Sequence, residues 1–182
     1  MKKITLTFVL LISAFVSFAQ STAIEDNARN NEVKINTTNL IGFKWVDLTY
    51  ERLINEESSF GVGLLVALND EDTGLNEYRT FSLTPYYRHF FSNKYAEGFF
   101  VEGFTMLHSG KEEVYYDTLN EGMGAYQVDS YTDFAVGVSA GFKIVSKRNF
   151  VAEFYIGLGR DLLDKSYREV VTRGGLSIGY RF

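Results

Sequence analysis

The chain has 182 residues, with 23 acidic and 18 basic side chains, one proline and no cysteine. Its net charge of −5 argues against a nucleic-acid partner, because binding to phosphates depends on basic side chains. Without cysteine there are no disulfides, so stability has to come from the fold itself.

The first nineteen residues have the pattern of a secretory signal peptide. A basic Met-Lys-Lys start is followed by an apolar run to Phe18, and the small residues Ser17 and Ala19 stand where a signal peptidase reads. The run is shorter than the roughly 20 apolar residues of a membrane helix. We expect export with cleavage after Ala19, followed by a flexible periplasmic leader over the polar residues 20–31.

Eight extended segments follow, in which apolar side chains recur at alternate positions, as they do on one face of a β-strand. They are approximately Glu32–Asn39, Trp45–Ile54, Ser59–Leu68, Tyr78–Phe91, Gly98–His108, Tyr131–Val145, Phe150–Gly159 and Val170–Phe182. Residues 32–182 are therefore predicted to form one all-β domain, an eight-stranded antiparallel barrel.

The connections between these segments alternate in length. Residues 55–58, 92–97 and 146–149 are tight turns, whereas 69–77, 109–130 and 160–169 are longer, with 40–44 as an exception. Short turns at one rim and long loops at the other are typical of outer-membrane barrels. With the leader in the periplasm, the tight turns are expected on that side.

Alternation alone also fits a soluble, lipocalin-like barrel with its apolar face inside. The glycines favour the reverse arrangement, because strand glycines on a water-facing surface would be unexplained liabilities, whereas in a narrow lumen they relieve crowding. Eight of them lie opposite the apolar face: Gly61, Gly63, Gly137, Gly141, Gly157, Gly159, Gly175 and Gly179. Aromatic residues on the apolar face also gather near the predicted periplasmic rim, as in an interfacial girdle: Phe60, Phe91, Phe99, Phe150 and Phe182. The sequence thus predicts a transmembrane barrel.

A set of charged residues falls on inward positions near the periplasmic strand ends: Lys34, Glu51, Arg88, Glu102, Lys143, Glu153 and Arg181. The symmetry of the turns places Arg88 across a ladder from Glu102, and Lys143 across from Glu153. We hypothesise an ion-pair network that closes the lower lumen, since eight strands leave an interior just wide enough for side chains. The alternative is a charged filter lining a pore.

Two short motifs resemble catalytic patterns. Residues 137–141 match the G-x-S-x-G pattern of a nucleophile elbow, but they lie inside an alternating strand and not at a strand-to-helix turn. His108 and Ser109 lie at the predicted outer end of the fifth strand, where lipid-A-modifying barrel enzymes keep catalytic residues, but as neighbours they point to opposite faces. We predict no catalytic residue, no metal site and no cofactor.

The longest loop has the composition of a hairpin that continues two barrel strands above the membrane. Residues 114–118 and 125–128 flank a glycine-rich turn. Its tyrosines Tyr115, Tyr116 and Tyr126 are candidates for contact with a partner at the cell surface, since tyrosine is enriched at recognition surfaces.

The last residues of the chain resemble a segment of a known class of proteins. Leu176, Ile178, Tyr180 and Phe182 alternate up to an aromatic terminus, which resembles the closing strand of a bacterial outer-membrane barrel. The whole pattern is similar to small barrels of the OmpA and OmpX type, and residues 33–42 with 48–52 look like an uncharacterised family of such barrels in the Bacteroidetes.

The resemblance implies a monomer in the cell outer membrane, in contact with membrane lipid and lipopolysaccharide. We expect a non-enzymatic protein with a structural or surface-interaction role through its extracellular loops. A lipid-modifying barrel enzyme and a narrow channel are the alternatives.

Overall fold

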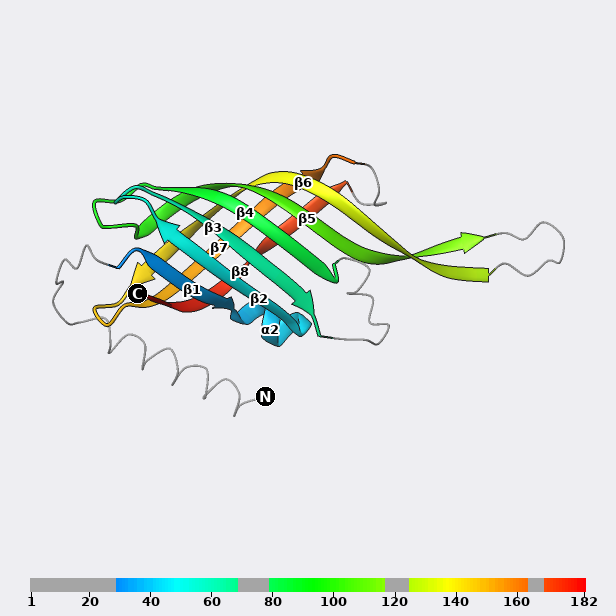
Figure 1. Cartoon of the computed structure of the whole chain (residues 1–182), viewed down its shortest axis with the longest axis horizontal. Coiled ribbons are helices and arrows are strands. Elements are labelled where there is room, and N and C mark those ends of the chain that lie inside the picture. The colour runs from blue at the N-terminus through cyan, green and yellow to red at the C-terminus, as the bar shows by residue number, and fades with distance from the viewer. Residues whose placement is uncertain (1–28, 69–78, 117–124, 164–168) are drawn as a thin grey trace.

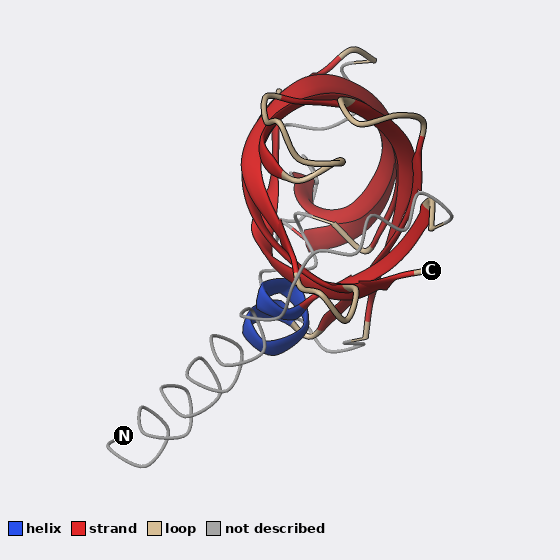
Figure 2. Cartoon of the chain, turned by 90° about the vertical axis from the view of Figure 1, so that its left-hand side faces the viewer, coloured by secondary structure: helices blue, strands red, loops and turns tan. Residues whose placement is uncertain are grey.

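The chain folds into a closed antiparallel barrel, in which each strand pairs with its sequence neighbours and the last pairs back with the first (Figures 1 and 2). A computed structural model describes residues 29–68, 79–116, 125–163 and 169–182. The strands are β1 (Asn31–Asn36), β2 (Trp45–Leu53), β3 (Ser58–Ala67), β4 (Phe81–Phe90), β5 (Gly98–Tyr116), β6 (Ala125–Val145), β7 (Phe150–Asp161) and β8 (Val170–Arg181). The predicted all-β, eight-stranded antiparallel barrel is confirmed.

The two ends of the barrel differ. At one end, here called the turn end, short turns join β2 to β3, β4 to β5 and β6 to β7. At the other, the loop end, β5 and β6 run on together as a hairpin that projects beyond the other strands (Figure 1). The ladder of this hairpin reaches Tyr116 opposite Ala125, so the predicted continuation of the two strands is confirmed.

The first predicted strand, Glu32–Asn39, is too long. β1 ends at Asn36, and the short helix α2 (Thr37–Phe43) follows. Asn36 caps this helix, because its side chain accepts a hydrogen bond from the Asn39 backbone N–H, and Lys44 ends it in a left-handed conformation. No helix among the described residues is long and apolar enough to cross a membrane.

The start of the barrel also lies slightly earlier than predicted. Asn31, assigned to the leader, opens β1, and its backbone exchanges hydrogen bonds with Phe182. Asn30 accepts a hydrogen bond from Leu53 N. The predicted signal peptide, residues 1–19, and the leader up to residue 28 lie outside the described residues.

The large apolar side chains point outward and the charged ones inward. Phe154 is 55% exposed and Ile178 is 40% exposed, whereas the fully buried side chains include Arg88, Lys34, Lys143 and Glu51. The predicted orientation of the two faces is therefore confirmed. The five phenylalanines predicted to form a girdle at the turn end are all exposed: Phe60, Phe91, Phe99, Phe150 and Phe182.

Glycines on the lumenal face make room for aromatic side chains from other strands. A methyl group on Gly137 would lie 2.4 Å from Phe104 Cζ and 2.4 Å from the backbone oxygen of Leu158. One on Gly141 would lie 2.6 Å from Phe100 Cζ. These aromatic rings belong to two buried clusters in the lumen, which sequence reasoning did not identify: Leu53, Phe90, Ala96, Phe100 and Tyr155 in one, and Tyr86, Phe104, Met106, Ala135 and Val171 in the other.

Gly137→Ala is expected to lower the free energy of unfolding by about 1–3 kcal/mol, because neither Phe104 nor the β7 backbone can easily yield to the added methyl group. Gly103→Ala is the matched control: it lies on the outer face, and a methyl group added there would have no neighbouring atom within 4 Å. Urea unfolding of the refolded variants measures both. Equal losses in the two variants would contradict crowding in the lumen.

Candidate functional site

A network of buried ion pairs fills the turn-end half of the lumen. All seven predicted charged residues point into it, and their side chains come from β1, β2, β4, β5, β6, β7 and β8. Five of them, Lys34, Glu51, Arg88, Glu102 and Lys143, are at most 1% exposed. Charges so fully removed from water need partners, because an unpaired buried charge is strongly destabilising.

Glu51 on β2 is the centre of this network. Its carboxylate accepts hydrogen bonds from Lys34 Nζ, from Lys143 Nζ at 2.8 Å and from Arg88 Nη1 at 3.1 Å. Two hydroxyl groups also donate to the Glu51 carboxylate, that of Ser59 at 2.6 Å and that of Tyr86 at 3.1 Å. A single carboxylate therefore links β1, β3, β4 and β6 across the lumen.

The predicted registers occur, but only one of them gives the predicted pair. Arg88 lies opposite Glu102 and binds it through Nη2 at 2.7 Å. Lys143 lies opposite Glu153, yet its Nζ donates to Glu32 and to Glu51, each at 2.8 Å. Glu153 instead accepts from Lys34 and Arg88, both at 2.8 Å. In so narrow a barrel, long side chains reach across the axis as easily as across a ladder.

Sequence reasoning missed two members of the network. Glu32 is fully buried and accepts from Lys143 and from Arg181 Nε at 2.8 Å. Arg173 donates to Glu102 Oε1 at 2.7 Å. Both residues could have been placed in the lumen from the alternation of side chains along a strand. Glu32 lies two residues before the inward-facing Lys34, and Arg173 lies eight residues before Arg181 on the same face.

Aromatic rings pack against the arginines of the network. The guanidinium carbon of Arg88 lies 3.8 Å from the centre of the Phe100 ring and 5.0 Å from that of Tyr86. Arg173 lies 5.1 Å from the ring centres of both Phe104 and Tyr155. These contacts hold the cations in place without water, and cation–π attraction adds to the ion pairs.

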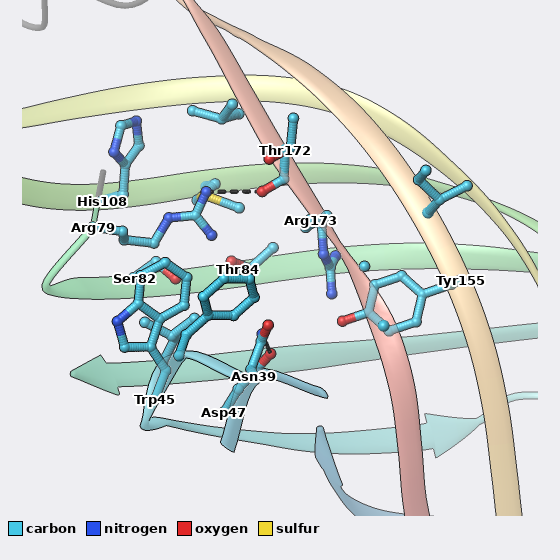
Figure 3. Close-up of a pocket in the computed structure, with 18 of the residues that line it drawn as sticks. Asn39, Trp45, Asp47, Arg79, Ser82, Thr84, His108, Tyr155, Thr172 and Arg173 are labelled. Carbon is cyan, nitrogen blue, oxygen red and sulfur yellow. Dashed lines mark hydrogen bonds between the residues drawn. The ribbon is translucent and has the colours of Figure 1, made fainter. Parts of the chain in front are cut away.

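Above the network, toward the loop end, lies a pocket of about 820 Å³ (Figure 3). Arg79, just before β4, and Arg173 on β8 both reach into it, as does His108 on β5. Asp47 on β2 also lines the pocket, and its carboxylate accepts from Asn39 Nδ2 at 2.7 Å and Asn36 Nδ2 at 3.2 Å.

Two buried polar atoms in this pocket have no hydrogen-bond partner within the described chain: Nε of Arg79 and Nδ1 of His108. Arg79 donates through Nη2 to the Thr172 carbonyl at 3.0 Å, and His108 Nε2 lies 2.8 Å from Asp161 Oδ1. A buried polar atom without a partner costs free energy, so such atoms call for an explanation.

Both short motifs lie within strands of the barrel. Residues 137–141 belong to β6, and Ser139 is buried and donates to Glu102 Oε1 at 2.7 Å, so this serine is part of the network. His108 is 2% exposed in the lumen, whereas the neighbouring Ser109 is half-buried on the opposite face of the strand.

The backbones of Tyr115, Tyr116 and Tyr126 belong to the projecting hairpin, with Tyr115 opposite Tyr126. The positions of their side chains lie outside what the structure describes. Over the described ranges, no group of three or more histidine, aspartate or glutamate side chains is arranged to hold a metal ion.

The chain has no match among protein-family models, curated proteins or solved structures. The function is therefore argued from the geometry of the barrel.

Glu51→Gln is expected to lower the free energy of unfolding by about 3–5 kcal/mol, because it keeps the shape of the side chain but removes the charge that Lys34, Lys143 and Arg88 share. Lys94→Gln is the control: its pair with Glu97 lies at the surface, and its loss should cost less than about 1 kcal/mol. Urea titrations of both variants give the two values. A loss for Glu51→Gln no larger than the control's would show that water reaches the network.

Proposed function

We propose that this protein is an exported outer-membrane β-barrel of the small OmpA and OmpX type, processed after Ala19, whose lower lumen is closed by the ion-pair network. It acts without catalysis, as a scaffold that presents its loop end at the cell surface. The observation that carries the proposal is the reversed distribution of side chains, with bulky apolar residues outside and charges inside.

The outer surface supports contact with lipid. Exposed apolar side chains cover every strand, among them Val138, Ile156 and Leu158, which are each at least 60% exposed. In water such a surface would aggregate, whereas soluble proteins rarely leave large apolar patches uncovered. Each strand also pairs with its sequence neighbours and the last with the first, so the sheet closes, as a spanning barrel requires.

The network argues against the narrow channel. Lys34, Glu51, Arg88 and Lys143 are at most 1% exposed and bond to one another across the axis. A charged filter would have to keep its side chains hydrated along a continuous path. In this network the charged side chains bond to one another, so few of their donors and acceptors remain for a passing ion to bind.

The lipid-modifying enzyme has one observation in its favour, the bond between His108 and Asp161 inside a polar pocket. A nucleophile bonded to the histidine is the missing part. Ser82 faces His108 across the β4–β5 ladder, but within the described residues His108 Nδ1 has no partner. A change in lipid-A mass between cells with and without the protein would favour the enzyme.

The proposed partners follow from the same geometry. Outer-membrane lipid and lipopolysaccharide would surround the apolar belt, and the projecting β5–β6 hairpin is the candidate for contact with a surface partner through residues 109–130. We propose a monomer, because the barrel closes on itself and the belt is then covered by lipid.

Val138→Lys is expected to impair folding into lipid vesicles, because the residue is 65% exposed within the apolar belt, and a lysine at the bilayer midplane costs about 2–4 kcal/mol. Ser130→Lys is the matched control, since it lies on the same strand and face but beyond the belt. The folded fraction can be read from the different gel mobilities of folded and unfolded barrels. Wild-type protein that stays dissolved and folded without detergent would refute membrane insertion.

Reconstituted in a planar bilayer, the wild-type protein is expected to give no discrete conductance steps, because the turn-end lumen is occupied by paired side chains. A porin measured under the same conditions serves as the positive control. Reproducible unitary conductance steps from the wild-type protein would refute the closed lumen and support the narrow channel.

A further inference from the structure

Between β2 and β8, the loop-end part of the barrel wall has no continuous backbone ladder. The ladder between β1 and β8 ends at Asn36 opposite Ser177, and that between β1 and β2 ends at Ile35 opposite Leu48. Both neighbours of β1 run further toward the loop end, β8 to Val170 and β2 to Trp45. In this stretch the described part of the chain places α2, and not a strand, between them (Figures 1 and 2).

Side chains replace the missing ladder along this edge of β8. Thr37 Oγ1 donates to the Leu176 carbonyl at 2.9 Å, and Leu176 N donates to Thr38 Oγ1 at 3.0 Å. Asn36 Nδ2 donates to the Gly174 carbonyl at 3.1 Å. Such bonds can exchange one by one as rotamers change, whereas a backbone ladder opens cooperatively. This seam is therefore the part of the wall that separates most easily.

The pocket lies directly behind this seam. Its lining includes Thr38 on α2, Trp45 on β2 and Gly175 on β8, which belong to the seam, and Phe154 and Ile156, whose side chains belong to the outer apolar surface. The same pocket includes the buried Arg79 and His108. The lining residues of this one pocket thus come from both the wall and the polar interior, and its volume is typical of ligand sites.

The pocket lining contains both signs of charge, Asp47, Asp161 and Glu169 beside Arg79, Arg173 and His108, and among these cations Arg79 is the one with no hydrogen bond to a carboxylate in the described chain. Arg79 is only 8% exposed, its described hydrogen bond goes to a neutral carbonyl, and its Nε has no partner among described residues. Burial lowers the pKa of Arg79, the like charge of Arg173 acts in the same direction, and the carboxylate of Asp47 opposes both. The pocket's Asp47 already accepts from two asparagines.

His108 can complete an anion site with Arg79. Its Nε2 lies 2.8 Å from Asp161 Oδ1, and Nδ1, which has no partner in the described chain, is a donor when the ring carries both protons. Both side chains line the same pocket, and an anionic group bound there would offer acceptors to the two atoms. A guanidinium group also offers two parallel donors that match a carboxylate or phosphate.

We propose that the loop-end pocket binds an amphiphile with an anionic head group, a long-chain fatty acid or a similar single-chain lipid, which enters from the membrane through the seam between β2 and β8. The head group binds Arg79 and His108, and the acyl chain lies along Trp45, Gly175 and Ile156 at the wall. This inference rests on the membrane location proposed above.

Trp45 provides the measurement, because it is the only tryptophan of the chain and lines the pocket. Protein in vesicles is titrated with dibromostearate, whose bromines quench tryptophan fluorescence on contact. The expected result is saturable quenching that unlabelled stearate reverses. Arg79→Gln should raise the half-saturating concentration at least about tenfold, the effect of losing roughly 1.4 kcal/mol of binding free energy. Arg160→Gln, an exposed arginine of β7, is the matched control and should leave it unchanged.

Two further ligands test whether the pocket recognises a charged lipid or a soluble anion. The methyl ester of dibromostearate tests the chain without the charge, and inorganic phosphate tests the charge without the chain. Equal quenching by acid and ester, or an Arg79→Gln titration that matches Arg160→Gln, would overturn anion recognition. Displacement of dibromostearate by low concentrations of phosphate would assign the pocket to a soluble anion and overturn the amphiphile.

The route is tested with a reversible lock across the seam. A Cβ atom at position 175 would lie 2.9 Å from Thr38 Cβ, whereas the Cβ atoms of a disulfide are about 3.8 Å apart, so Thr38→Cys with Gly175→Cys can form the bond once α2 shifts outward by about 1 Å, in a chain that has no other cysteine. Gly175 has a left-handed φ of 133°, and the reduced form of the same variant controls for the strain of the substitution. Oxidation should slow quenching by vesicle-borne dibromostearate, and a reductant should restore it.

Unchanged quenching kinetics in the oxidised form would overturn entry through the seam. Flotation of the vesicles reports insertion separately. Protein that floats but shows no saturable quenching would overturn this inference and leave the proposed function standing, whereas protein that fails to float would refute the membrane location itself.

Discussion

The structure depends on the mutual neutralisation of charges in the turn-end lumen. Eight strands enclose a space that only side chains can fill, and this chain fills it with glutamates, lysines and arginines whose partners lie on other strands. Glu51 alone receives donors from four strands. The bonds from Lys143 to Glu51 and from Arg88 to Glu153 join strands that are not neighbours in the sheet, so they form only as the barrel closes. The ion pair between Glu32 and Arg181 also joins the first strand to the last, because it lies across the ladder between β1 and β8.

The two halves of the lumen therefore have opposite properties. In the turn-end half, ion pairs, hydroxyl groups and aromatic rings satisfy one another, which leaves a rigid interior. In the loop-end half, Arg79 and His108 each keep a polar atom without a partner in the described chain, around a pocket of about 820 Å³. A chain selected only for stability would have filled this space with apolar side chains, as it did around Phe104. Incomplete satisfaction at one end is thus better explained by recognition than by packing.

The sequence predicts the barrel well because its two strongest signals are local. Alternation places each side chain on a face, and turn length sets the order of the strands, so Arg88 opposite Glu102 follows from counting outward from a turn. The same parity would also have placed Glu32 and Arg173 in the lumen. Which base meets which carboxylate could not be predicted, because Lys34 reaches past β8 to Glu153 on β7, and Lys143 on β6 reaches across the barrel axis to Glu51 on β2. Such contacts depend on the diameter and tilt of the closed sheet, which no short stretch of sequence encodes.

The end of β1 is the other feature that local signals miss, and it determines whether the wall is sealed. Thr37 and Thr38 are β-branched and continue the strand pattern, yet Asn36 caps a helix and, with Asn39, binds Asp47 on β2. A strand continued past Asn36 would offer β8 a regular ladder and close the wall with backbone hydrogen bonds. The helix offers Leu176 only two threonine hydroxyls, and it leaves behind it a pocket whose polar groups are unsatisfied. The helix cap at Asn36 therefore interrupts the backbone ladder of the wall at the place where the pocket that contains Arg79 lies behind it.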